Sequence, residues 1–145
     1  PMRIAEHLGR SPRLSERVTA APGLRVPGAW DPFELAVRAV LGQQVTVAGA
    51  TTLAGRLVER WGRRVDLAPD LTHLFPRPEV LAEAEVESIG MPRARGATIR
   101  ALAAAVAAGD LLLEASRGLD EAVARLRALP GMGDWTAQYI AMRAY

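Results

Sequence analysis

Residues 129–137 read Leu-Pro-Gly-Met-Gly-Asp-Trp-Thr-Ala, a composition suited to holding a phosphate. A short Gly-x-Gly turn between two helices exposes backbone N–H groups at the start of the second helix, where the helix dipole also favours an anion. Gly131 and Gly133 can adopt positive φ and let a phosphate approach without a Cβ in the way. Asp134 and Thr136 can cap the opening turn. The alternative is an ordinary tight turn between two helices of a bundle.

The segments around this turn have the apolar spacing of helices. Asp31 and Pro32 give one helix an N-cap and a first-turn proline, and Ser11 and Pro12 do the same for another. Residues 62–78 are expected to be loop-like, with one turn of helix. No segment keeps a period-two alternation, so the prediction is an all-α helical bundle that forms a single domain, 1–145. The expected helices are 4–9, 12–21, 31–41, 45–61, 93–108, 119–129 and 134 onward, and residues 79–84 form a short acidic segment.

The composition excludes several classes of protein. Half of the 145 residues are apolar, which suits a folded globule. No apolar run approaches the ~20 residues that a membrane-spanning helix needs, and the N-terminus resembles neither a signal peptide nor a transit peptide. The absence of cysteine excludes a disulfide framework, a thiolate nucleophile and a zinc knuckle. We expect a cytoplasmic protein that has no membrane partner.

The formal net charge of +2 is unevenly distributed along the chain. Residues 1–64 carry a net +5, residues 65–90 a net −5 and residues 91–145 a net +2. Two basic blocks around an acidic one could form a face that attracts phosphate, although ordinary solvated helix surface would give the same counts. All 18 basic residues are arginine, so no lysine amine is available to form a Schiff base.

The string 129–137 resembles the hairpin of the helix–hairpin–helix DNA glycosylases, and its Trp135 variant resembles the AlkA-type 3-methyladenine DNA glycosylases. The similarity extends to residues 22–28, 31–34, 41–47 and 90–92, which follow the family's order and spacing. Residues 22–44 most resemble the glycosylase portion of bacterial fusions with an alkylation-response regulator. The resemblance therefore covers most of the chain, from residue 22 to residue 143.

This resemblance implies DNA repair by base excision, in a bacterial cytoplasm and in association with the nucleoid. Such an enzyme flips an alkylated purine of the 3-methyladenine class out of double-stranded DNA and hydrolyses its N-glycosidic bond, without a small-molecule cofactor. In the family, enzymes that also cleave the strand have lysine at the position of Trp135. The resemblance therefore implies a monofunctional glycosylase that only releases the base.

The resemblance also implies which residues form the base pocket and the DNA contacts. Trp135 and Tyr139 would line the pocket, where two electron-rich rings four positions apart suit a cationic purine. The alternative places both rings in the core, with Met142 continuing the stripe. The hairpin residues Gly131, Met132, Gly133 and Thr136 would contact the DNA backbone.

Two further segments are implied to contact DNA. Gln43 and Gln44 occupy the loop that enters the minor groove in this family, where Gln44 departs from the leucine wedge of well-known members. A polar turn between helices is the alternative. Arg93 and Arg95 open a long helix and could contact phosphates, although a solvated first turn is an equal possibility.

The family also holds a monovalent cation, Na⁺ or K⁺, on backbone carbonyls of the hairpin. The matching carbonyls here are those of Arg127, Leu129 and Met132. The family's catalytic aspartate, which stabilises the oxocarbenium-like sugar, would fall about ten residues beyond Tyr145. We therefore expect no catalytic residue within this chain, and a fragment that is truncated at both ends and inactive alone.

Two other functions remain open at this point. A non-catalytic helix–hairpin–helix module would bind only the DNA backbone. A helical protein-interaction domain could contain the same Gly-x-Gly turn without binding phosphate, and its DNA affinity would not fall steeply with salt.

Overall fold

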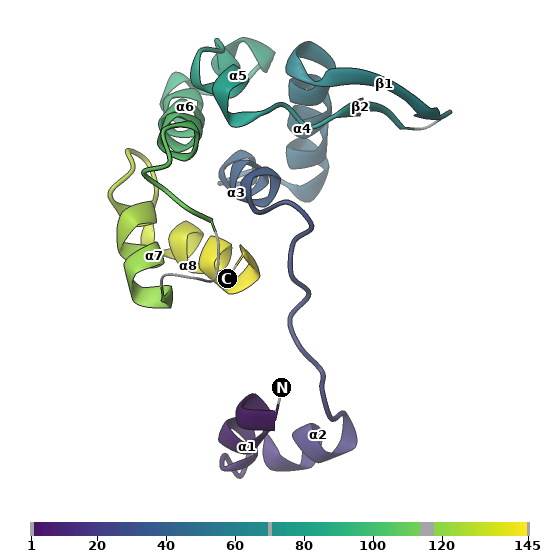
Figure 1. Cartoon of the computed structure of the whole chain (residues 1–145), viewed down its shortest axis with the longest axis vertical. Coiled ribbons are helices and arrows are strands. Elements are labelled where there is room, and N and C mark those ends of the chain that lie inside the picture. The colour runs from purple at the N-terminus through teal and green to yellow at the C-terminus, as the bar shows by residue number, and fades with distance from the viewer. Residues whose placement is uncertain (1, 70, 114–117, 145) are drawn as a thin grey trace.

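The computed structural model describes residues 2–69, 71–113 and 118–144, and within them the predicted helical architecture is confirmed (Figure 1). None of the described helices is long and apolar enough to cross a membrane. The helices are α1 (Met2–Gly9), α2 (Ser15–Ala20), α3 (Pro32–Leu41), α4 (Val47–Trp61), α5 (Pro78–Ala82), the 3-10 helix η1 (Val86–Ile89), α6 (Arg93–Ala107), α7 (Leu119–Arg127) and α8 (Asp134–Ala144).

Side-chain hydrogen bonds cap the N-terminal ends of α3 and α4, the two helices that residues 42–44 connect. The Asp31 carboxylate accepts hydrogen bonds from the N–H groups of Phe33 (2.8 Å) and Glu34 (3.2 Å), which confirms the predicted cap of α3. Helix α4 starts two residues later than predicted, because the Thr46 hydroxyl accepts the N–H of Gly49 at 3.1 Å and so caps it.

The predicted start of α2 is wrong. The helix begins at Ser15, and Ser11 contributes its backbone carbonyl, which accepts the N–H of Ser15 at 2.9 Å. Residues 12–14 form a turn before the helix.

The prediction of a loop over residues 62–78 is also wrong. Strands β1 (Arg63–Ala68) and β2 (Leu71–Leu74) pair as an antiparallel hairpin whose register is irregular between Arg64 and Ala68. Its strand residues are mostly exposed, so neither face selects an alternating apolar pattern that the sequence could reveal. The hairpin is joined to the core by Phe75, whose ring meets that of Phe33 edge-on at 6.2 Å.

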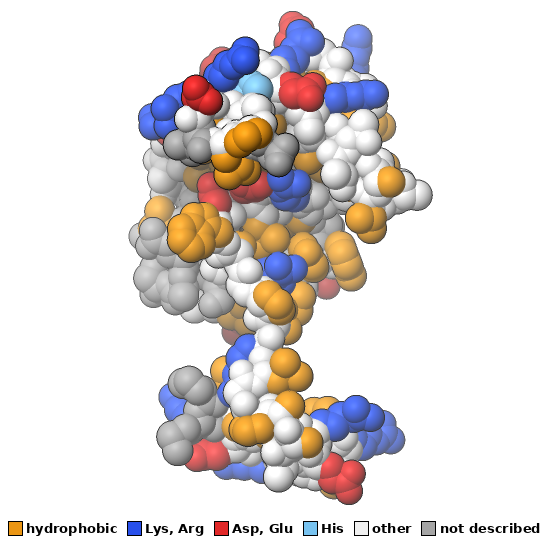
Figure 2. Space-filling model, turned by 90° about the vertical axis from the view of Figure 1, so that its right-hand side faces the viewer, with side chains coloured by type: hydrophobic (Ala, Val, Ile, Leu, Met, Phe, Trp, Pro, Cys, Tyr) orange, Lys and Arg blue, Asp and Glu red, His pale blue; other side chains and the backbone are white. Residues whose placement is uncertain are grey.

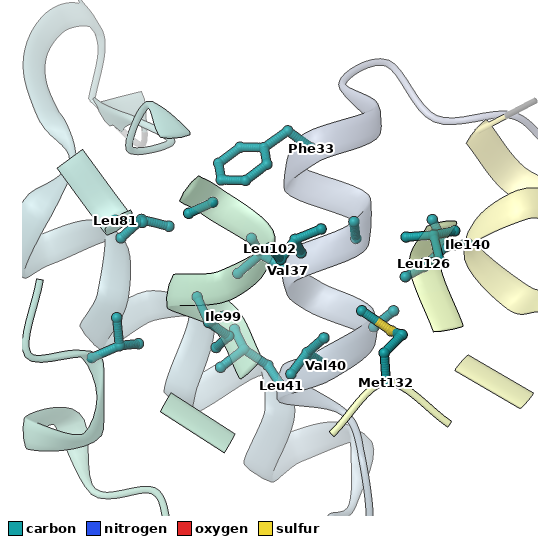
Figure 3. Close-up of a cluster of buried hydrophobic side chains, with 14 of the residues drawn as sticks. Phe33, Val37, Val40, Leu41, Leu81, Ile99, Leu102, Leu126, Met132 and Ile140 are labelled. Carbon is teal, nitrogen blue, oxygen red and sulfur yellow. The ribbon is translucent and has the colours of Figure 1, made fainter. Parts of the chain in front are cut away.

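Helix α3 runs through the centre of the hydrophobic core (Figure 3). Its apolar side chains point both toward Leu81 of α5 and Ile99 of α6 on one side and toward the α7 and α8 side chains on the other. Met132, in the turn between α7 and α8, inserts its side chain into the same core and is 5% exposed. The core therefore holds the turn between α7 and α8 against α3 and α6.

The N-terminal helices α1 and α2 pack on each other and stand apart from the rest of the molecule (Figure 1). An extended segment joins α2 to α3 and forms the narrow waist seen in Figure 2. The indole of Trp30, near the end of this segment, is fully exposed. The elements that position residues 129–137, which are α3, α6, α7 and α8, thus belong to the part of the molecule that follows this segment.

Candidate nucleic-acid interface

The turn between α7 and α8 is a short link between two helices, in which Gly131 but not Gly133 has the positive φ that the sequence allowed for both. The N–H of Met132 donates to the carbonyl of Leu129 at 3.1 Å, and Gly131 has φ +75°. The N–H of Ala137 donates to the carbonyl of Gly133 at 3.0 Å, so the N–H groups before it belong to the unbonded first turn of α8. We call residues 131–133 the hairpin.

The two glycines of the hairpin face different surroundings. A Cβ on Gly131 would lie 2.1 Å from the hydroxyl oxygen of Thr98 on α6, so this glycine permits the close packing of two elements. A Cβ on Gly133 would meet no atom of the chain within 4 Å. Gly133 therefore leaves open space outside the protein, on the side where a ligand could approach.

Asp134 differs from its predicted capping role, and the predicted DNA contact of Met132 falls to its backbone. Asp134 forms an ion pair with Arg127 at 3.3 Å, in which both side chains are well exposed, and no cap by its side chain is found among the described hydrogen bonds. The side chain of Met132 is buried, so only its backbone remains to contact DNA. The side chain of Met132 lies on the inner side of the turn, in the core, whereas Asp134 lies on its outer side, in solvent.

The loop between α3 and α4, residues 42–44, lies against the hairpin. The side-chain amide of Gln43 donates to the Thr136 hydroxyl at 3.1 Å and to the Gly131 carbonyl at 3.4 Å. Thr136 is itself buried. The structure thus brings together the two segments that the sequence assigned separately to DNA contact.

Gln44 is exposed at the tip of this loop and has φ +54°. Among the described residues it is the one non-glycine residue with positive φ. This conformation is unfavourable for a residue with a Cβ, and it persists only where neighbouring contacts enforce it. A backbone held in this way at a loop tip is compatible with the predicted wedge.

The two arginines that open α6 have different surroundings. Arg95 donates from Nη2 to the carbonyl of Gln43 at 2.6 Å, so it supports the loop from behind. Arg93 is exposed. The pKa of Glu87 on η1 is lowered by a hydrogen bond from the backbone and by the hydrogen bond from Arg100, and the charge of Arg93 adds the smallest contribution. Arg93 therefore suits a phosphate contact better than Arg95.

Trp135 and Tyr139 stack on each other, with ring centroids 5.4 Å apart and planes 9° from parallel. Trp135 is 72% exposed, Tyr139 is half-buried and Met142 is 53% exposed, so the alternative of a buried core stripe is wrong. The guanidinium of Arg143 lies 5.8 Å from the centre of the Tyr139 ring and donates to its hydroxyl at 3.2 Å. The outer face of Trp135 is thus the open aromatic surface of the pair.

Trp135, the 42–44 loop and the hairpin glycines line one open hollow of about 670 Å³, whereas Tyr139 is not among its lining residues. Among the described residues that line it, none is an aspartate or glutamate. Nor do the described histidines and carboxylates gather anywhere into a group that could hold a metal ion. The lining residues are Gly42, Gln43, Gln44, Pro92, Ala94, Arg95, Thr98, Gly131, Gly133, Trp135 and Thr136.

Sequence reasoning missed two residues that shape this site. Thr98 lies in the Ala-rich helix α6 and touches the hairpin at Gly131. Arg143 links the aromatic pair to the segment before α3, because its Nε donates to the carbonyl of Pro27 at 2.5 Å. Neither contact leaves a local pattern, since the partners lie far apart in the sequence.

Comparison with known proteins shows that the chain is similar to DNA repair enzymes of the AlkA type. It is 49% identical over 144 residues to the probable bifunctional transcriptional activator/DNA repair enzyme AlkA of Mycobacterium tuberculosis, a match that covers 99% of this chain and 29% of the relative. It is 40% identical over 129 residues to DNA-3-methyladenine glycosylase 2 of Escherichia coli, over 87% of this chain and 45% of the relative. No protein-family model matches the chain.

The fold agrees with the sequence comparison. The chain superposes with a TM-score of 0.74 and 21% identity on the 8-oxoguanine glycosylase/lyase of Clostridium acetobutylicum, solved with double-stranded DNA, over 98% of this chain and 50% of that one. The chain spans less than half the length of the curated relatives that it matches. By sequence, the chain is therefore similar to AlkA-type DNA-3-methyladenine glycosylases, and its fold is that of solved DNA glycosylases.

Proposed function

We propose that this chain grips double-stranded DNA and receives an extruded alkylated purine, as part of a monofunctional DNA-3-methyladenine glycosylase. The observation that carries the proposal is the meeting of three elements around one hollow: the hairpin, the 42–44 loop and the open face of Trp135. These elements can hold a phosphate, fill the gap in the base stack and stack on the displaced base.

The aromatic pair supports a role in stacking a base. The outer face of Trp135 is open, whereas the Tyr139 ring is covered by Trp135 on one face and approached by the guanidinium of Arg143. An alkylated purine carries positive charge and would gain from an electron-rich indole face. We therefore assign the stacking surface to Trp135, and assign Tyr139 to its support.

Base release requires a carboxylate that this hollow does not supply. None of its described lining residues is acidic, and Asp134 is engaged with Arg127 outside it. We propose that the aspartate which stabilises the oxocarbenium-like sugar is supplied by polypeptide other than this chain. The chain also contains no lysine amine that could form a Schiff base for strand cleavage, which supports the proposal of a monofunctional enzyme.

Two further assignments follow from the same family. The carbonyls of Arg127 and Leu129, which precede the hairpin, and of Met132 within it are proposed to hold a monovalent cation, Na⁺ or K⁺. The protein is proposed to act in the bacterial cytoplasm on nucleoid DNA, without a small-molecule cofactor.

Fluorescence anisotropy with two labelled duplexes tests the proposal. One duplex is intact, and the other carries a stable abasic-site analogue that mimics the gap left by an extruded nucleotide. The affinity should fall steeply with added salt, and the chain should prefer the second duplex. Equal affinity for the two duplexes would favour a module that binds only the DNA backbone, and affinity insensitive to salt would contradict phosphate binding.

A second measurement tests the missing carboxylate. The chain is incubated with methylated duplex DNA, and free 3-methyladenine is quantified by chromatography. We expect binding without release of the base. Release by the chain alone would show that its own residues suffice for hydrolysis.

A further inference from the structure

We infer that Gln43 is a positioning residue that couples the 42–44 loop to the hairpin, so that phosphate binding and insertion of Gln44 occur as one event. This inference rests on the proposed function, because it concerns the two segments proposed to contact DNA. It assigns to Gln43 a contact within the protein, in place of the direct DNA contact expected from the sequence.

On the hairpin side, one amide nitrogen serves two acceptors. Gln43 Nε2 donates to the Thr136 hydroxyl at 3.1 Å and lies 3.4 Å from the Gly131 carbonyl, which it also reaches as a donor. Thr136 is 4% exposed, so its hydroxyl is removed from competing water. A primary amide carries two N–H donors on one nitrogen, which matches two acceptors. A methionine of similar length has none.

On the loop side, the backbone of Gln43 is fixed as well. Arg95 Nη2 donates to the Gln43 carbonyl at 2.6 Å, a hydrogen bond strengthened by the charge of the guanidinium. The next residue, Gln44, is the one with φ +54°. The strained residue is therefore preceded directly by a residue that is anchored through both its side chain and its carbonyl.

The anchoring has a consequence for DNA binding. A non-glycine residue stays in the left-handed region only while its surroundings enforce that conformation. Without the amide of Gln43, the loop would lose its link to the hairpin, and Gln44 could relax away from the position from which it points into the hollow. The hairpin has its own core anchor in Met132 and would still meet a phosphate.

The test compares Gln43→Met with Gln138→Met, a matched change at an exposed position of α8 outside the hollow. The measured quantity is the ratio of the dissociation constants for the intact duplex and for the duplex with the abasic-site analogue. Loss of the amide of Gln43, with its hydrogen bonds to Thr136 and Gly131, should lower this preference about three- to tenfold in Gln43→Met. The preference of Gln138→Met should equal that of the unmodified chain.

A double-variant cycle separates positioning from general stabilisation. If Gln43 acts through Gln44, then Gln44→Ala removes the preference and adding Gln43→Met lowers it no further. Additive losses would overturn the inference, and so would an unchanged ratio with equally weakened binding to both duplexes. If Gln43→Met does not fold, Thr136→Val removes the acceptor of the same hydrogen bond and should lower the ratio in the same direction. An unmodified chain with no preference would instead contradict the proposed function itself.

Discussion

Replacement of Gly131 by alanine should destabilise the fold through a single clash inside the DNA-facing hairpin. The new Cβ would lie 2.1 Å from the hydroxyl oxygen of Thr98 and 3.4 Å from its Cβ. Thr98 is 2% exposed and donates to the Ala94 carbonyl at 3.1 Å, so its side chain has little freedom to turn away. The backbone of residue 131 is also left-handed, at φ +75°.

These two effects set the expected magnitude. A left-handed backbone costs a residue with a Cβ about 1–2 kcal/mol. Overpacking against a buried, hydrogen-bonded threonine adds about 1–3 kcal/mol. The free energy of unfolding of Gly131→Ala should therefore fall by about 2–5 kcal/mol, which lowers the Tm by roughly 4–20 °C in a chain of this size.

Gly133→Ala is the matched control, because a Cβ there meets nothing within 4 Å and the backbone has no positive φ. Its free energy of unfolding should change by less than about 0.5 kcal/mol. Its DNA affinity should nevertheless fall, because the new methyl group faces the proposed path of the phosphate. The two glycines would thus separate stability from binding.

Urea unfolding followed by circular dichroism measures the stability of both variants. Thr98→Ala in the Gly131→Ala background should restore about 1–3 kcal/mol, since it removes the obstructing side chain and leaves only the backbone strain. The reasoning would be refuted if the two glycine variants lost equal stability, or if Thr98→Ala restored none of it.

Three other expectations follow from the same site and its supports. Trp135→Ala should weaken binding of a duplex that contains an alkylated purine by about 1–3 kcal/mol in anisotropy measurements, whereas Trp30→Ala, which removes a fully exposed indole outside the hollow, should not. Arg93→Gln should reduce the slope of log affinity against log salt by about one, and an unchanged slope would remove Arg93 from the phosphate contacts. Because its pKa is lowered in the folded chain, Glu87 contributes stability above its ordinary pKa near 4.5 that is lost as the pH falls through the lowered value. Acid unfolding of Glu87→Gln should therefore depend less on pH in that range, and identical curves would show that the lowered pKa of Glu87 does not contribute to stability.

The hairpin could be predicted from the sequence because its determinants are local. Two glycines, a preceding proline and a following first turn specify a short link between helices, and the cap at Asp31 is equally local. The stacked pair Trp135 and Tyr139 follows from a spacing of four residues on one helix. In each of these cases the partners lie within one or two helical turns.

The contacts that join these pieces could not be predicted, because they depend on how distant elements cross. Gln43 meets Thr136 across 93 positions, and Arg143 meets Pro27 across 116. The antiparallel pair of strands β1 and β2 could not be predicted for a different reason. Its exposed strands have no buried face, and the periodicity that identifies a strand comes from such a face.

The left-handed backbone of Gln44 places stability and recognition in opposition at one residue. Holding a side chain in this region costs about 1–3 kcal/mol, whereas glycine or asparagine would adopt the same backbone more easily. Either substitution would shorten or remove the side chain that projects into the hollow. A search for more stable variants of this chain would therefore favour the residues that recognise damage least, and thermal stability alone would be a misleading guide to a better repair protein.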